Sequence, residues 1–132
     1  MDERMGIICQ IVRKDMFVYT VNFQFRKGGN SMRYEKHRNT LTVFLEGELD
    51  HCCAQSIRRE MDRLLDDLKV QRLVIDMGEM NFMDSSGIGV ILGRYRILAS
   101  RGGSVAVRGM NRQVARVFQL SGMGQIIEVM KG

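Results

Sequence analysis

Residues 81–89, with the sequence Asn-Phe-Met-Asp-Ser-Ser-Gly-Ile-Gly, constrain the fold of this chain more than any other segment. They follow an apolar run at residues 73–75 that is typical of a buried strand, and they precede a stretch with helical periodicity. The segment is therefore predicted to be a strand-to-helix turn, with Asp84 or Ser85 as the helix N-cap. A serine hydroxyl there lies at the positive end of the helix dipole, so it suits a phosphate, a nucleophile or a bound anion.

Length and composition set the broad class of protein. A chain of 132 residues is long enough for one domain with a modest core. No run of about 18 apolar residues occurs, so no transmembrane helix is predicted. Three cysteines, of which Cys52 and Cys53 are adjacent, make no disulfide framework and fit a reducing cytoplasm. The net charge of +5 is spread along the chain rather than clustered, so it gives little support for nucleic-acid binding.

Residues 1–31 differ from the rest and are predicted to be an N-terminal extension. Aromatic and β-branched residues alternate with others over residues 16–25, which predicts a strand. Lys27-Gly28-Gly29, shortly before Met32, reads like a translated ribosome-binding site, so we expect that synthesis starts at Met32. The alternative is a native edge strand followed by a flexible Gly-Gly linker. The segment does not resemble a secretory signal peptide.

From Met32 onward, strand and helix signals alternate in the order β-β-α-β-α-β-α-β. This order predicts a small α/β domain over residues 32–132, in which helices cover a mixed sheet of four to five strands with an antiparallel hairpin at one edge. Strands are expected at residues 33–37, 40–45, 72–76, 104–108 and 125–129. The first helix has an apolar stripe at Ala54, Ile57, Met61, Leu64, Leu65 and Leu68.

The helix after Ser85, expected to run to about Ser100, has two predicted faces. The core face is predicted to hold Ile88, Ile91, Leu92, Tyr95 and Leu98. The opposite face, predicted to be exposed, holds Ser86, Gly89, Val90, Gly93, Ile97 and Ser100. Each glycine in a helix interior costs roughly 1 kcal/mol relative to alanine. Either another molecule approaches this face closely, or the face packs tightly on another element of the same chain.

Familiar catalytic motifs fail on these residues. A hydrolase elbow would need glycine two positions before the serine, where Met83 or Asp84 stands instead. Walker and dinucleotide-binding glycine patterns are incomplete. His51-Cys52-Cys53 is too compact to surround a metal ion and reads as a helix start. The chain therefore lacks the cluster of titratable residues that an active site requires, and no metal or cofactor is expected.

The residues from Phe82 to Tyr95 resemble the signature of the STAS domains of bacterial anti-sigma factor antagonists, closest to the sporulation branch. The stretches at residues 47–51 and 117–122 also match that family's pattern. The resemblance covers about residues 32–129, and only Cys52-Cys53 depart slightly from the usual polar helix start.

The resemblance implies a non-catalytic cytoplasmic switch. A partner that is both an anti-sigma factor and a serine kinase, with its bound nucleotide, would phosphorylate Ser85, and a phosphoserine phosphatase would reset the switch. No direct binding of nucleic acid or membrane is implied. The alternatives are a STAS module of the general stress response and a nucleotide- or small-molecule-binding STAS domain. The residues expected to bind the partner are Asp50, His51, Asp84, Ser86, Gly87, Gly89, Val90, Gly93 and Ile97.

Overall fold

The computed structural model describes residues 4–13, 16–24 and 31–131. Seven strands form one sheet in sequence order: β1 (Arg4–Arg13), β2 (Met16–Gln24), β3 (Ser31–His37), β4 (Thr40–Leu49), β5 (Arg72–Met83), β6 (Ser104–Arg108) and β7 (Glu128–Met130). The helices are α1 (His51–Leu65), α2 (Ser85–Ala99) and α3 (Arg112–Leu120), with a short 3₁₀ turn η1 (Met123–Gln125) before β7.

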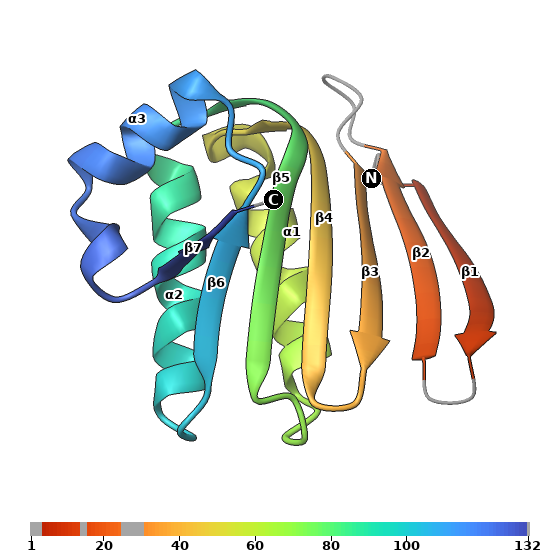
Figure 1. Cartoon of the computed structure of the whole chain (residues 1–132). Helices are drawn as coiled ribbons and strands as arrows, with labels where there is room; N and C mark the ends of the chain where they lie inside the picture. Colours follow the sequence, from red (N-terminus) through yellow and green to blue (C-terminus); the bar gives the residue numbers. More distant parts are fainter. Residues whose placement is uncertain (1–3, 14–15, 25–30, 132) are drawn as a thin grey trace.

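The sheet is mixed, as predicted, and changes direction at one place. Strands β1 to β4 pair antiparallel, and strands β4 to β7 pair parallel. The five strands β3 to β7 match the predicted number, and the predicted edge hairpin is β3–β4. The strand expected at residues 16–25 is β2, and its last expected residue lies outside the described residues. Strand β1, which was not predicted, pairs with β2 and lengthens the sheet beyond β3 (Figure 1).

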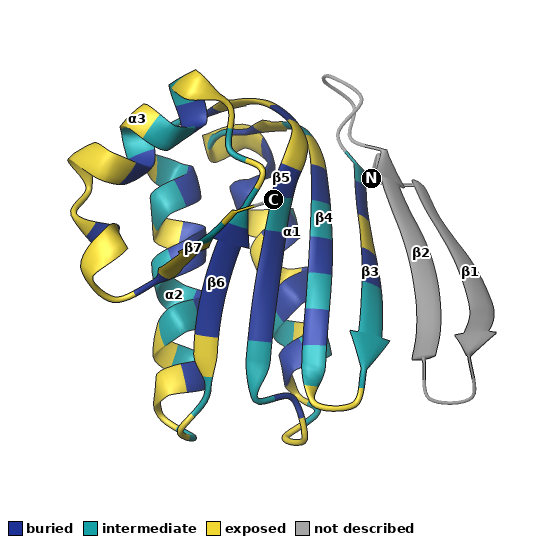
Figure 2. Ribbon diagram, viewed as in Figure 1, coloured by how far each residue is buried: buried dark blue, intermediate teal, exposed yellow. Residues whose placement is uncertain are grey.

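The core lies between the sheet and helices α1 and α2, which cover the same face of the sheet (Figure 1). Strand β4 shows the alternation that creates this core: Leu41, Val43 and Leu45 are buried, whereas Thr42 and Phe44 point to the opposite face and are half-buried (Figure 2). The apolar residues of α1 pack onto this layer, with one exception. Leu68 is 74% exposed, contrary to the prediction, because α1 ends at Leu65.

Helix α2 is rotated relative to the prediction. Its buried residues are Gly87, Val90, Ile91, Arg94 and Leu98. The predicted core residues Ile88, Leu92 and Tyr95 are only half-buried and pack against the core from its margins. The sequence pattern was misleading because apolar residues occur around most of this helix and a charged residue occupies the centre of its buried face.

Candidate functional site

Two helix N-termini lie side by side at one end of the sheet. Strands β4 and β5 end in register, with Leu49 opposite Met83, and the Asp84 amide donates to the Leu49 carbonyl at 3.3 Å. Each strand leads directly into a capped helix. Asp50 caps α1 by accepting from the amides of Cys52 and Cys53. Asp84 caps α2 by accepting from the Ser86 amide at 2.8 Å. The two positive dipole ends and two carboxylates therefore share one edge of the molecule.

The N-cap of α2 is Asp84, so Ser85 is the first residue of the helix. Ser85 is exposed. Its hydroxyl forms no hydrogen bond with the part of the chain that the structure describes, whereas the Ser86 backbone is tied to the Asp84 carboxylate. The Ser85 oxygen is thus free to react or to carry a charged group. Ser86 is half-buried, so the two adjacent serines differ in access.

Two of the residues expected to bind a partner face inward instead. Val90 has no exposed surface and belongs to the core. Gly87 is also buried, and a Cβ atom there would lie 2.4 Å from Met83 Cγ and 3.1 Å from Leu49 Cδ2. Glycine at position 87 therefore lets the first turn of α2 approach β4 and β5. The predictions of a surface role for Gly87 and Val90 are wrong.

The outward side of α2 carries the two remaining glycines. No heavy atom from elsewhere in the described chain lies within 4 Å of a Cβ atom built at Gly89 or Gly93. Packing within the described chain therefore does not account for glycine at these positions. Helical spacing puts Gly89, Leu92 and Arg96 in line with Ser85, with Gly93 on one flank. Ile97, which was predicted to be exposed, lies farther round the helix, is half-buried and packs against the core. The sequence analysis did not place Leu92 and Arg96 on this face.

The start of α1 completes this edge of the molecule. His51 and Cys52 are exposed, and the Cys52 sulfur lies 3.8 Å from His51 Nε2. Cys53 is buried and donates to the Glu48 carbonyl at 2.9 Å. Burial raises the pKa of the Cys53 thiol to about 11, so this sulfur is a poor nucleophile at neutral pH.

Helix α3 supports β5 just before the site. Asn111 caps α3 by accepting from the Val114 amide at 2.8 Å, and its Nδ2 donates to the Met80 carbonyl at 3.1 Å. Gln113 accepts from the Met83 amide at 3.0 Å and donates to the Met83 carbonyl at 2.9 Å. Nothing in the sequence pattern pointed to Gln113, because the contact joins segments 30 residues apart.

A buried charge links α1 and α2. The side chain of Arg94 is 6% exposed, and its Nε lies 3.0 Å from Asp62 Oδ1 without the geometry of a hydrogen bond. Arg94 Nη1 has no partner among the described residues. Burial, opposed by Asp62 and assisted by the like charge of Arg58, lowers the pKa of Arg94. The pair sits in the helix interface, away from the N-termini.

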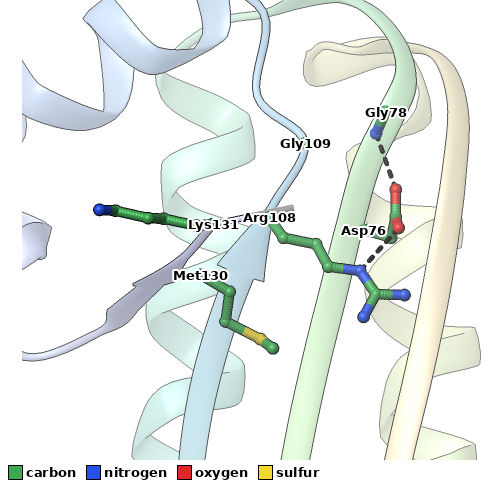
Figure 3. A pocket seen from close by; sticks show the side chains of 6 residues that line it. All are labelled: Asp76, Gly78, Arg108, Gly109, Met130 and Lys131. Carbon is green, nitrogen blue, oxygen red and sulfur yellow. Dashed lines mark hydrogen bonds and ion pairs between the residues drawn. The ribbon is translucent and has the colours of Figure 1, made fainter.

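A concave region lies on the face of the sheet opposite the helices. A pocket of about 390 Å³ opens where β5 and β6 separate, and it is lined by Asp76, Gly78, Arg108, Gly109, Met130 and Lys131 (Figure 3). Asp76 Oδ2 accepts from Arg108 Nε at 2.8 Å, and Asp76 Oδ1 accepts from the Gly78 amide at 2.8 Å. Figure 3 shows the Lys131 side chain pointing away from this pair. Because the Asp76 carboxylate is paired with Arg108, we interpret this arrangement as a cross-strand ion pair.

No helix in the described ranges is both long enough and apolar enough to cross a membrane. Across residues 4–13, 16–24 and 31–131, no group of three or more His, Cys, Asp or Glu side chains is arranged to hold a metal ion.

Comparison with known families identifies the class. The family model described as "STAS domain" matches residues 31–131, which include the five strands β3 to β7 and all three helices. The chain belongs to the STAS domain family.

Individual relatives within the family narrow the assignment. The chain is 40% identical over 95 residues to an anti-sigma F factor antagonist of Paenibacillus polymyxa, a match that covers 72% of this chain and 81% of the relative. It is 26% identical over 97 and 95 residues to anti-sigma-B factor antagonists of Listeria monocytogenes and Bacillus subtilis, covering 72% of this chain and 82% and 85% of the relatives. Within the STAS family, the chain is therefore one of the anti-sigma factor antagonists.

Solved structures agree with this result. The anti-sigma factor antagonist SpoIIAA in its unphosphorylated form superposes with a TM-score of 0.64 at 28% identity, covering 77% of this chain and 89% of SpoIIAA. The phosphorylated form of Bacillus SpoIIAA superposes with a TM-score of 0.58 at 25% identity, covering 95% and 91% of the two chains. The mixed sheet with helices on one face is thus the SpoIIAA-like fold.

Proposed function

We propose that this protein is a partner-switching antagonist controlled by phosphorylation of Ser85. In the unphosphorylated form it binds an anti-sigma factor that is also a serine kinase with bound nucleotide, and the sigma factor is released. Phosphorylation of Ser85 ends the complex, and a phosphoserine phosphatase restores the binding form. The protein itself is regulatory rather than catalytic, and it acts in the cytoplasm during sporulation.

One observation carries the proposal: an exposed serine with an unbonded hydroxyl begins a helix whose outward side has room for a close approach at Gly89 and Gly93. A kinase must reach the acceptor oxygen, and a flat helix surface beside it allows another backbone to come near. The existence of SpoIIAA in unphosphorylated and phosphorylated forms supports the same mechanism for this relative.

The docking surface, as we now define it, comprises Ser85, Ser86, Gly89, Leu92, Gly93, Arg96 and Ile97 of α2, with Asp50, His51 and Asp84 at the adjoining helix starts. Arg96 adds an exposed positive charge that the sequence analysis did not include, and we expect it to meet an acidic group of the partner. Gly87 and Val90 are not part of this surface, because both are buried and pack inside the domain.

Phosphorylation would release the partner by repulsion at the interface rather than by unfolding. A phosphoserine adds about −1.5 to −2 charges, and at a helix N-terminus the dipole and the amides favour them. Asp84 lies next to the modified residue and Asp50 at the neighbouring helix start, so the docking surface acquires a concentrated negative charge. A kinase site that already holds nucleotide phosphates would be repelled by it.

The test is incubation of the wild type, Ser85→Ala and Ser86→Ala with the cognate anti-sigma kinase and ATP, followed by intact-mass measurement. We expect one phosphate on the wild type and on Ser86→Ala, and none on Ser85→Ala, which should stay bound. Ser85→Asp should bind poorly. Full phosphorylation of Ser85→Ala would refute the assignment of the acceptor and make Ser86 the next candidate.

A second experiment, with the anti-sigma factors of the sporulation and general stress-response branches, tests which sigma factor is controlled. The higher identity to the sigma F branch than to the sigma-B branch favours a sporulation partner. If only the anti-sigma factor of the general stress response bound the protein and phosphorylated it, the sporulation assignment would be wrong while the switch itself would stand. Nucleotide binding by the isolated domain would instead favour a ligand-binding role.

A further inference from the structure

Strand β5 extends well past its neighbour β6, and its last residues need another partner. Pairing with β6 covers only residues 72–76 of β5, whereas pairing with β4 continues to Met83. On the β6 side, the backbone amides and carbonyls of residues 77–83 therefore face no strand. Unpaired backbone groups at a sheet edge require other hydrogen-bond partners.

The start of α3 supplies partners for several of these groups, from Met80 to Met83. Gln113 bonds both backbone groups of Met83, at 3.0 and 2.9 Å, so its side-chain amide takes the place that a peptide group of a neighbouring strand would occupy. Asn111 Nδ2 donates to the Met80 carbonyl at 3.1 Å and to the Asn81 carbonyl at 3.3 Å. We call the two side chains, Asn111 and Gln113, the α3 clamp.

We propose that Gln113 is a positioning residue for the phosphorylation of Ser85, an inference that rests on the proposed function. Met83 is the last residue of β5 and directly precedes the N-cap Asp84. From the β4 side, the Leu49 carbonyl holds the Asp84 amide, and from the α3 side Gln113 holds both backbone groups of Met83. The peptide that leads into Ser85 is therefore fixed from two directions.

The side chain of Met83 transmits this position to α2. Met83 is fully buried, and a Cβ atom at Gly87 would lie 2.8 Å from the Met83 sulfur, so the first turn of α2 rests directly on Met83. A displacement of Met83 would consequently move both the cap and the first turn that presents Ser85. Gln113 has no bond to Ser85 itself, so it acts only through Met83.

Transfer of a phosphoryl group is sensitive to such a displacement. An acceptor oxygen misplaced by about 1 Å can slow an oriented reaction by about a hundredfold. The docking surface along α2 is otherwise untouched by Gln113. Loss of the clamp is therefore expected to lower kcat for phosphorylation of Ser85 more than it raises KM.

The experiment compares Gln113→Ala with Gln119→Ala, an exposed glutamine of the same helix. For Gln113→Ala we expect hydrogen exchange of the Met83 amide to be about tenfold faster and kcat for phosphorylation by the cognate kinase to be about tenfold lower, with KM within about twofold of wild type. Gln119→Ala should match the wild type in all three quantities.

A second variant separates positioning from general stability. In Gln113→Glu the carboxylate can still accept from the Met83 amide but cannot donate to the Met83 carbonyl, and protonation restores that donor. The Met83 amide resonance of Gln113→Glu should therefore return toward the wild-type position as the pH falls, a titration that Gln113→Ala should lack.

Two results would overturn the proposal. Unchanged exchange at Met83 in Gln113→Ala would show that the clamp does not hold β5, and faster exchange with an unchanged kcat would show that it does not position Ser85. If the wild type accepted no phosphate, the proposed function would fail and the positioning role with it, even where the exchange data confirmed the clamp.

Discussion

The glycines of α2 allow a sharp test, because the structure predicts opposite signs for substitutions only two residues apart. At Gly89 and Gly93 a Cβ atom would meet no heavy atom from elsewhere in the described chain within 4 Å. Alanine there should stabilise the fold by about 1 kcal/mol per site, the usual difference between alanine and glycine in a helix interior. For a domain of about 100 residues, that corresponds to a rise of about 4 °C in the melting temperature.

At Gly87 the same substitution should have the opposite effect. The new methyl group would lie 2.4 Å from Met83 Cγ, inside a layer where Met83 and Leu49 are both buried. Overpacking of a core costs typically 1–3 kcal/mol, and the helical preference of alanine offsets about 1 kcal/mol of it. The net expectation for Gly87→Ala is a loss of about 1 kcal/mol.

Urea denaturation followed by far-ultraviolet circular dichroism measures all three variants, since the helices give the signal. The reasoning would be refuted if Gly89→Ala or Gly93→Ala destabilised the protein while Gly87→Ala did not. Such a result would mean that the outward side of α2 is covered by the chain itself.

A bulky side chain at Gly93 should weaken binding of the partner without destabilising the fold. Gly93→Arg should fold normally, because the space at Gly93 is open, yet bind the anti-sigma factor more weakly through steric hindrance and desolvation. Ala99→Arg, at an exposed position of the same helix farther from Ser85, is the distance control and should weaken binding less. Calorimetry that found equal affinity for Gly93→Arg and wild type, with both folded, would remove Gly93 from the docking surface.

Three further predictions concern other parts of the molecule. Asp62→Ala should destabilise the protein by about 2 kcal/mol because it leaves Arg94 buried without its counter-ion. Arg94→Met should change the free energy of unfolding by less than about 1 kcal/mol, and chemical denaturation measures both variants. Alkylation of the folded protein near neutral pH should label Cys52 and spare Cys53, as read by peptide mass, and equal labelling would contradict the burial of Cys53. A chain starting at Met32 should keep its melting temperature and partner affinity, and a large loss of either would show that pairing of β2 with β3 stabilises the domain.

Much of the fold could be predicted because the local signals agree with the final structure. The Thr40–Leu49 strand has the alternation of a half-covered sheet, and α1 has a regular apolar stripe up to Leu65. Asp50, Asp84 and Asn111 are all N-cap residue types and all cap helices. Where composition, periodicity and capping point the same way, the element order follows.

The errors arise where tertiary contacts decide. Strand β5 was predicted to end at residue 76, but it continues to Met83 because β4 pairs with it on one side and the α3 clamp holds it on the other. Leu68 was placed on the core face, although α1 ends before it. The rotation of α2 places Arg94 on the buried face, where its charge lies beside Asp62 of another helix. None of these partners is near in sequence, so no local pattern could reveal them.

The position of Ser85 separates the chemistry of the proposed switch from the stability of the fold. Met83 and Gly87, which support the first turn of α2, are buried in the domain, whereas Ser85 and the open positions at Gly89 and Gly93 lie on its outward side. A phosphate on Ser85 therefore disturbs no internal contact and meets a favourable helix dipole. The two outward glycines cost the folded domain about 2 kcal/mol together, a loss that is consistent with the proposed approach of a partner to this surface. A domain that gives up stability on one face, while it holds the acceptor serine rigidly at the end of that face, is suited to a switch that changes its surface without changing its fold.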